Sequence, residues 1–265
     1  MQQPSVPVSD HRTSFDWRSR LRAAGLHLGL SAFVAGLAAL LVFGLWYPYP
    51  YRSISGGSDL FRLVVTVDVV LGPLITFAIF NRRKPRSELR RDLTIVVLLQ
   101  LAALAYGLWT VYQARPVHMV FEYDRFRVVH LAEIPRELEG QTPAGIEVAP
   151  ARPTLLSLRP FRDEREKAEM TMAALSGVQL SARPDLWQSY EAGKGAILAA
   201  ARPVAELKKR FADRTAEIEA ALHESGAPED RAAYLPLVGR NAEAWTVLLD
   251  ASTAKVIGFV PLDSF

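Results

Sequence analysis

The fold of this chain is decided by residues 60–80, which read LFRLVVTVDVVLGPLITFAIF. A helix needs about 20 predominantly apolar residues, rising 1.5 Å per residue, to cross a hydrocarbon core about 30 Å thick. This stretch has that length and that composition. The residues that follow it, from Asn81 to Asp92, are polar and strongly basic. The pattern predicts a membrane-spanning helix that ends in a basic loop.

Two features interrupt this predicted span. Asp68 places a carboxyl group near the middle of the bilayer, where an isolated charge costs roughly 2.5–3.5 kcal/mol. Its side chain is therefore expected to face protein, water or a proton rather than lipid. Gly72 and Pro73 follow one turn later, and proline lacks the N–H that would bond to the carbonyl of Val69. A break in the helix is therefore predicted one turn beyond the acid.

Two further apolar runs flank this span, at about 26–46 and 93–112, and the chain of 265 residues becomes evenly charged beyond Tyr112. We expect an α-helical membrane domain of three transmembrane helices over 26–112, followed by a soluble α+β domain over 113–265. Residues 1–25 form an amino-terminal segment whose first ten residues are predicted to be disordered. The first span is longer than the apolar core of a signal peptide, so we expect it to be retained.

The distribution of charge predicts an orientation. Residues up to Tyr112 carry 12 Lys and Arg against 6 Asp and Glu, and the remainder carries 19 against 22. Four basic residues precede the first span, one lies in the connector 47–59, and six lie in the loop 81–92. Since basic loops stay in the cytoplasm, the amino terminus and the loop 81–92 should be cytoplasmic and residues 113–265 exported. Anionic headgroups account for the basic excess, so no nucleic-acid partner is expected.

Local patterns predict the elements of the exported half. Two β-hairpins are expected, one from 117–123 with 126–131 and one from 245–249 with 255–260. A strand is expected at 154–159, and Asp163 followed by Glu166 resembles a capping box for a helix over 164–175. A second, amphipathic helix is expected from Pro203 to Gly226. The connector 47–59, rich in Tyr and Pro, is expected to be a short exposed turn at the membrane interface.

The sequence contains none of the spacings that mark nucleotide binding, zinc proteases or serine hydrolases. It has no cysteine and only five scattered histidines, of which His118 and His130 fall where the first hairpin brings strands together. We interpret these two as packing or surface residues. The acidic residues from Asp163 to Glu169 alternate with basic ones, as on a solvated helix face. No catalytic residue, metal, cofactor or small-molecule substrate is therefore expected, and the protein is not expected to be an enzyme.

Asp68 admits two interpretations. It bonds within its own bundle, to Gln100 or Tyr106 of the third span, and fixes helix register. Alternatively, it receives a hydrogen-bond donor or a cation from a partner helix in the membrane, which is the usual suspicion for an intramembrane acid. A proton relay would need a second ionisable residue at this depth, and the sequence shows none.

Residues 68–81, DVVLGPLITFAIFN, together with the basic loop RRKPRSELRRD at 82–92, resemble the type IV pilin accessory proteins of the TfpX/TfpZ kind. Residues 101–116, LAALAYGLWTVYQARP, resemble the same family. The resemblance implies a non-enzymatic, multi-pass protein of the bacterial inner membrane with a periplasmic carboxyl-terminal domain. It also implies a role in helping particular pilin subunits assemble into, or extend as, type IV pili.

This resemblance makes a type IV pilin subunit the expected partner, with Asp68, Gly72, Pro73 and Asn81 as the partner-binding residues. In this hypothesis the second span engages the transmembrane helix of the pilin while the exported domain contacts its head. An alternative is a membrane-anchored sensor with a ligand-binding periplasmic domain, although the expected cytoplasmic segments are too short to hold an effector. A membrane enzyme would need a second polar centre between the spans.

Overall fold

The computed structural model describes residues 16–81, 84–240 and 244–265. The chain forms two compact units, which we describe separately. The helix unit comprises the described residues up to Gly36 together with Val64–Ala105. The sheet unit comprises Leu37–Leu63 together with Tyr106–Phe265. The prediction of disorder for residues 1–10 falls outside the described residues, as do Arg82 and Arg83 of the basic loop.

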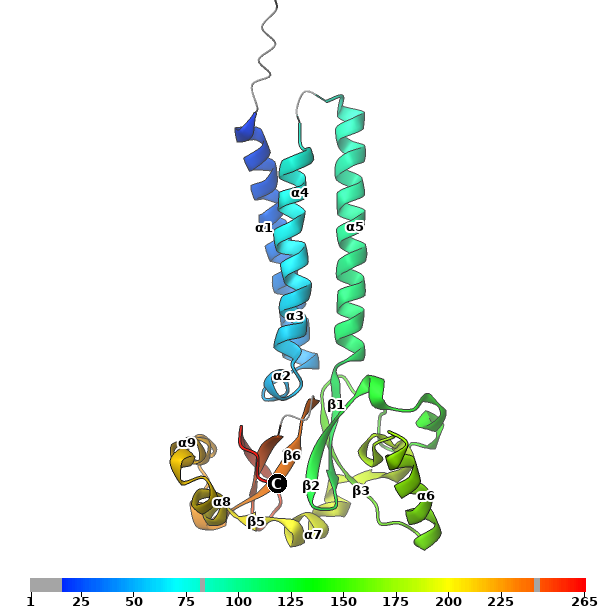
Figure 1. Cartoon of the computed structure of the whole chain (residues 1–265), viewed down its shortest axis with the longest axis vertical. Coiled ribbons are helices and arrows are strands. Elements are labelled where there is room, and N and C mark those ends of the chain that lie inside the picture. Colours follow the sequence, from blue (N-terminus) through cyan, green and yellow to red (C-terminus); the bar gives the residue numbers. More distant parts are fainter. Residues whose placement is uncertain (1–15, 82–83, 241–243) are drawn as a thin grey trace, which may run out of the picture. The chain divides into compact units, whose positions relative to one another are not determined.

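Three helices in the described part of the chain are long and apolar enough to cross a membrane. The first, Trp17–Trp46, consists of α1 (Trp17–Leu41) and one π-helical turn (Val42–Trp46). The second runs over Gly57–Ile79 and the third is α5 (Arg86–Gln113). These helices, coloured blue, cyan and green in Figure 1, contain nearly all of the spans expected at 26–46, 60–80 and 93–112. The first and third begin several residues earlier than expected, because their basic first turns are also helical.

The second helix does not break at the position that the sequence predicts. It consists of α3 (Gly57–Thr66), a π-helical turn (Val67–Leu71) and α4 (Gly72–Ile79), without a gap. Pro73, in the first turn of α4, cannot donate to a carbonyl one turn earlier, and the wider π-turn accommodates that missing bond. The irregular turn therefore contains Asp68, instead of following it.

The connector between the first two apolar helices is not an exposed turn, so that prediction is wrong. It includes the short helix α2 (Tyr51–Ile54), in which Tyr51 is 8% exposed and Ile54 is fully buried. Both side chains belong to the same apolar cluster as Met119, Phe126 and Leu235 of the sheet. Tyr47 is also fully buried, and its hydroxyl donates to the carbonyl of Val111 at 3.2 Å. The connector is thus part of the core of the sheet unit.

The sheet unit is built on one eight-stranded mixed sheet in the order β4-β3-β1-β2-β6-β7-β8, with β5 paired to β6. Both predicted hairpins are confirmed, and their strands share this sheet, as expected for one α+β domain. The neighbours β1 and β3, and β2 and β6, run parallel. The strands are β1 (Pro116–Glu122), β2 (Arg125–His130), β3 (Thr154–Leu158), β4 (Trp187–Ser189), β5 (Arg202–Pro203), β6 (Ala232–Val238), β7 (Ala244–Asp250) and β8 (Val256–Val260).

Four helices pack around the sheet: α6 (Glu164–Leu175), α7 (Tyr190–Ala200), α8 (Val204–Arg210) and α9 (Thr215–Ser225). Figure 1 shows α6 at the β3 end of the sheet and α8 with α9 at the other. The single helix predicted over 203–226 is wrong, since the chain leaves helical geometry at Phe211. This break lets α8 pack on β6 and α9 pack on β8. Gly226 ends α9 at φ 67°, which only glycine adopts readily.

Candidate functional site

The structure gives Asp68 a partner for its backbone but none for one of its carboxylate oxygens. The side-chain amide nitrogen of Gln100, on α5, donates to the backbone carbonyl of Asp68 at 3.2 Å. The carboxylate Oδ1 of Asp68 is enclosed and has no hydrogen-bond partner within the described residues, and the same holds for Gln100 Oε1. Gln100 therefore contacts Asp68, as the sequence suggests, without satisfying its carboxylate.

Gly72 and Pro73 are both buried, and they allow this close approach of α4 and α5. A Cβ atom added at Gly72 would collide with the amide of Gln100. By contrast, a Cβ at Gly29 or Gly36 on α1 would meet nothing within 4 Å. Gly72 is thus the position where the helix must lack a side chain so that the Gln100 amide can reach the π-helical turn.

Asn81 is the one expected partner-binding residue that is not brought to this place. It follows α4, thirteen residues after Asp68, which corresponds to about 20 Å along a helix. Its backbone carbonyl accepts from the N–H of Lys84 at 3.2 Å. Lys84 in turn pairs with Asp92 at 2.7 Å, so this region forms its own polar cluster at the start of α5.

Two contacts that the sequence did not suggest join α1 to α4. His27 hydrogen-bonds with the hydroxyl of Thr76 at 2.6 Å, and Thr76 is 2% exposed. Arg20, two turns earlier on the same face of α1, donates to the carbonyls of Phe77 and Ala78 at 3.0 and 2.6 Å. These carbonyls lie at the carboxyl end of α4, where the helix dipole favours a cation. The spacing of seven residues between Arg20 and His27 was the signal that could have revealed them.

The arrangement at Asp68 brings together two hydrogen-bond acceptors that lack donors in the described part of the chain. Two enclosed oxygens, Asp68 Oδ1 and Gln100 Oε1, both accept hydrogen bonds and neither receives one from the described residues. In an apolar surrounding an unsatisfied polar group costs several kcal/mol, so such a pair attracts a donor or a cation. The neighbouring side chains Val67, Val70 and Leu71 are between 42% and 50% exposed, which leaves an apolar surface beside the pair.

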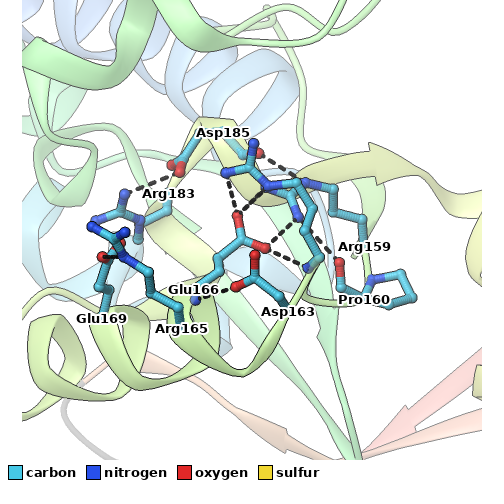
Figure 2. A network of polar contacts seen from close by, with 9 residues as sticks. Arg159, Pro160, Asp163, Arg165, Glu166, Glu169, Arg183 and Asp185 are labelled. Carbon is cyan, nitrogen blue, oxygen red and sulfur yellow. Dashed lines mark hydrogen bonds and ion pairs between the residues drawn. The ribbon is translucent and has the colours of Figure 1, made fainter.

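In the sheet unit, the acidic stretch at the start of α6 is not a solvated face throughout, which corrects that prediction. Glu166 is 5% exposed, and its carboxylate accepts from Arg159 at 2.8 and 3.0 Å. It also accepts from the Nε of Arg162 at 2.9 Å and from the backbone N–H of Arg162 at 2.6 Å. Figure 2 shows the guanidinium of Arg159 directed at this carboxylate. The two guanidinium groups hold the pKa of Glu166 well below its usual range.

Asp163 caps α6 as predicted, since its side chain accepts from the N–H of Glu166 at 2.7 Å (Figure 2). The reciprocal half of the predicted capping box is absent, because the Glu166 side chain bonds to the two arginines instead. Next to this network lies a cavity of about 740 Å³, bounded by the end of β3, the loop that follows it, and α7.

The histidines do not form a metal site in the described residues, where no group of three potential ligands occurs. His118 pairs with Val129 in the hairpin and His130 with Pro116, so the two are not opposite each other. His118 is fully buried, bonds to Thr154 at 2.8 Å and lies 4.6 Å from the ring of Trp187. Burial lowers the pKa of His118 to about 4. Both histidines are packing residues, as the sequence suggested.

These features define a class: a protein with helices suited to a bilayer, an unsatisfied acidic centre among them, and a mixed sheet and helix domain. Comparison with known proteins makes this more specific. Residues 15–56, which include α1 and the buried connector, match the family model of the fimbrial assembly protein FimB.

Two relatives from Dichelobacter nodosus match most of the chain, and a third matches 43% of it. The fimbrial assembly protein of serogroup I is 34% identical over 246 residues, covering 92% of this chain and 95% of the relative. That of serogroup E1 is 33% identical with the same coverage, and that of serogroups C1 and C2 is 42% identical over 113 residues. No solved structure matches the chain. The chain therefore belongs to the family of fimbrial assembly proteins and has a role in pilus assembly.

Proposed function

We propose that this protein is a non-enzymatic accessory protein of the bacterial inner membrane, of the TfpX/TfpZ kind, that binds type IV pilin subunits and assists their assembly into pili. The observation that carries the proposal is the pair of enclosed acceptors at Asp68 and Gln100. A helix of a pilin subunit in the same bilayer that brings a donor or cation, such as its charged amino terminus, satisfies them. Gly72 and Pro73 shape the surface of α4 that the pilin helix would contact, and Asn81 follows the carboxyl end of α4.

The packing of the connector supports the proposed topology. Tyr51 and Ile54 share a buried cluster with strands β1 and β2, which supports a topology with the connector and the sheet on the same side of a membrane. In this topology the first helix reaches the side of the sheet, the second helix leaves it and the third returns to it. The amino terminus and the loop 81–92 then lie on the other side. The basic residues in those segments favour the cytoplasm, and the sheet unit is then periplasmic.

The relatives support the proposal, since each is named as a fimbrial assembly protein. The absence of familiar catalytic spacings in the sequence is consistent with a protein that binds and does not catalyse. The accessory role also fits the two units, one for the membrane layer and one for the aqueous layer.

A second function is favoured by one observation. The cavity of about 740 Å³ falls in the range of about 300–1,000 Å³ that is usual for small-molecule sites. It would suit a membrane-anchored sensor with a ligand-binding periplasmic domain. A small molecule that copurifies in the cavity, without any pilin, would favour the sensor over the accessory protein.

Photo-crosslinking in living cells tests the first proposal. A photoreactive residue at Val67 or Leu71, both partly exposed beside Asp68, should form an adduct with pilin. Phe33 on α1 and Leu99 on α5 are 64% and 66% exposed, more than Val67 and Leu71, and serve as control positions. Adducts should form at least about tenfold more often at the first two positions. Equal yields at all four positions, or none, would contradict the proposal.

A further inference from the structure

The sheet unit contains a cavity that takes no part in the proposed intramembrane contact at Asp68. The cavity of about 740 Å³ is walled on its apolar side by Phe121, Leu158 and Phe161. On the α7 side it is lined by Ala192 and Ala196, whose small side chains leave space that a larger residue would fill. The cavity is open to solvent, because both alanines are exposed.

The loop that forms one wall of this cavity is held in place by buried charge. Arg159, at the end of β3, and Arg162, just before α6, both donate to the carboxylate of Glu166. Arg159 also donates to the backbone carbonyl of Asp185 at 3.2 Å, as Figure 2 shows. Charge-assisted bonds of this kind are short and geometrically specific. The wall is therefore formed before any ligand arrives.

Free hydrogen-bond donors lie at the mouth of the cavity. Arg162 is 76% exposed and uses its Nε and Nη2 groups on Glu166, while its Nη1 has no partner within the described residues. The acids at the mouth are engaged, since Asp163 caps α6 and Glu164 pairs with Lys167 at 3.4 Å. The mouth thus presents N–H groups suited to a carboxylate or a carbonyl beside an apolar interior.

Tyr123 adds a strained aromatic residue at the same mouth. It stands in the two-residue turn between Glu122 and Arg125, at φ 61°, where glycine or asparagine is usual. The left-handed conformation disfavours a side chain of this kind. Tyr123 is 46% exposed, and its ring centroid lies 5.7 Å from that of Phe161. Backbone strain of this kind is concentrated at binding sites, where the position of the side chain outweighs the conformational free energy that it costs.

We propose that this cavity receives a large apolar side chain from the part of the pilin subunit outside the bilayer, with a carboxylate or carbonyl of the same segment bound by Arg162. This inference rests on the proposed function, because it names a second contact with the same partner. Rigid aromatic rings together with an exposed arginine are the composition typical of protein-binding hot spots. An open mouth also suits a segment that enters from a larger surface.

The first test is photo-crosslinking with the full-length protein in its membrane. A photoreactive residue at Ala192 should form adducts with pilin, whereas the same residue at Ala199 should not. Ala199 is exposed on the same helix but does not line the cavity. Adducts at both positions in equal amount would overturn the inference.

The second test fills the cavity. Ala196→Trp should lower the adduct yield from position 192 by at least about tenfold, which corresponds to about 1.4 kcal/mol of binding free energy. Ala199→Trp should leave it unchanged. Tyr123→Asn should also lower the yield while leaving the melting temperature unchanged or raised, since asparagine tolerates φ 61°. A lower melting temperature with an unchanged yield would mean that Tyr123 serves only the fold.

The outcomes separate this inference from the proposal on which it rests. Adducts from Val67 that persist in the Ala196→Trp variant, with none from Ala192 in the parent protein, would overturn the cavity contact and retain the intramembrane one. If the parent protein formed no pilin adducts from either Val67 or Ala192, the proposed function itself would be overturned. A small molecule that fills the cavity in the purified protein, with no pilin adduct at Ala192, would also overturn the inference.

Discussion

Two acidic residues, Glu166 in the sheet unit and Asp68 in the helix unit, differ in how their carboxylates are satisfied. Glu166 is 5% exposed and accepts from two guanidinium groups and a backbone N–H. Asp68 has an enclosed oxygen with no donor among the described residues. Removing one partner of a buried ion pair is strongly destabilising because it leaves a charge uncompensated. An enclosed polar atom without a partner also costs free energy unless another molecule supplies one.

The two carboxylates therefore have different surroundings. In the sheet unit, Glu166 joins Arg159 to Arg162 and so fixes the loop before α6. In the helix unit, contacts such as His27 with Thr76 join the helices, and the proposed function assigns the Asp68 oxygen that has no partner in the described residues to a donor from pilin. Substitutions in the two units should separate these roles, and truncation in the core of the sheet unit should cost the most stability.

The largest effect is expected from Ile54→Ala. Ile54 is fully buried in the cluster that includes Met119 and Phe126, so its truncation leaves a cavity in the sheet unit. Such changes cost about 2–5 kcal/mol of unfolding free energy. Thermal unfolding followed by tryptophan fluorescence measures the loss. Arg52→Ala, on the exposed side of the same short helix, is the control, and equal effects would mean that the connector does not stabilise the sheet unit.

A pH titration should give the next largest effect. His118 has a pKa of about 4 in the folded protein and about 6.5 when unfolded, because burial disfavours its charged form. The unfolded state therefore binds the proton first as pH falls, so the stability is fully present above pH 6.5 and is lost between pH 6.5 and 4. The difference corresponds to about 3 kcal/mol.

The variant His118→Gln should flatten this part of the pH profile, since glutamine does not titrate. His223→Gln makes the same substitution at an exposed position of α9 and serves as the control for the substitution itself. A profile that keeps its full slope in His118→Gln would assign the effect to other groups.

Glu166→Gln should lower the melting temperature of the sheet unit and leave adducts from Val67 intact. The substitution removes the charge that both Arg159 and Arg162 approach. Because the pKa of Glu166 is depressed in the folded protein, this contribution is present above its ordinary pKa and is lost as pH falls below it. Glu169→Gln, which removes only an exposed pair with Arg165, is the matched control. Similar losses from the two variants would contradict the structural role of Glu166.

Gly72→Ala tests the close approach in the helix unit. A methyl group there meets the amide of Gln100, and overpacking of this kind costs about 1–3 kcal/mol. Gly29→Ala makes the same chemical change on α1, where nothing lies within 4 Å, and should stabilise its helix slightly. The melting temperature of the protein in micelles distinguishes the two. Equal shifts would show that α4 and α5 do not depend on this contact.

The outline of this fold could be predicted from sequence because its signals are local. Two β-prone runs around a short polar turn predicted each hairpin, and Asp163 predicted the start of α6. Strand β6 was missed because Pro236 argues against a central strand. The helix α7 was missed because Gly193 and Gly195 obscure its pattern.

The errors arose where the outcome depends on distant partners. Tyr47 and Tyr51 suit a membrane interface as well as a protein core, and only the three-dimensional packing decides between them. Glu166 looks solvated until Arg159 and Arg162 are placed beside it. For the candidate site, the sequence identified Asp68 and suggested Gln100, because an acid in an apolar span stands out. It could not locate the π-helical turn, or show that the Gln100 amide bonds to the backbone and not to the carboxylate.

The measurement that tests the central claim most directly is the amount of pilin that copurifies with Asp68→Asn, compared with the parent protein at the same membrane level. Asparagine keeps the size of the side chain and removes its charge, so the free energy of unfolding should change by less than about 1 kcal/mol. The account predicts that pilin association and surface piliation fall sharply. Unchanged association and piliation at equal protein level would contradict the claim that Asp68 receives its donor from the pilin.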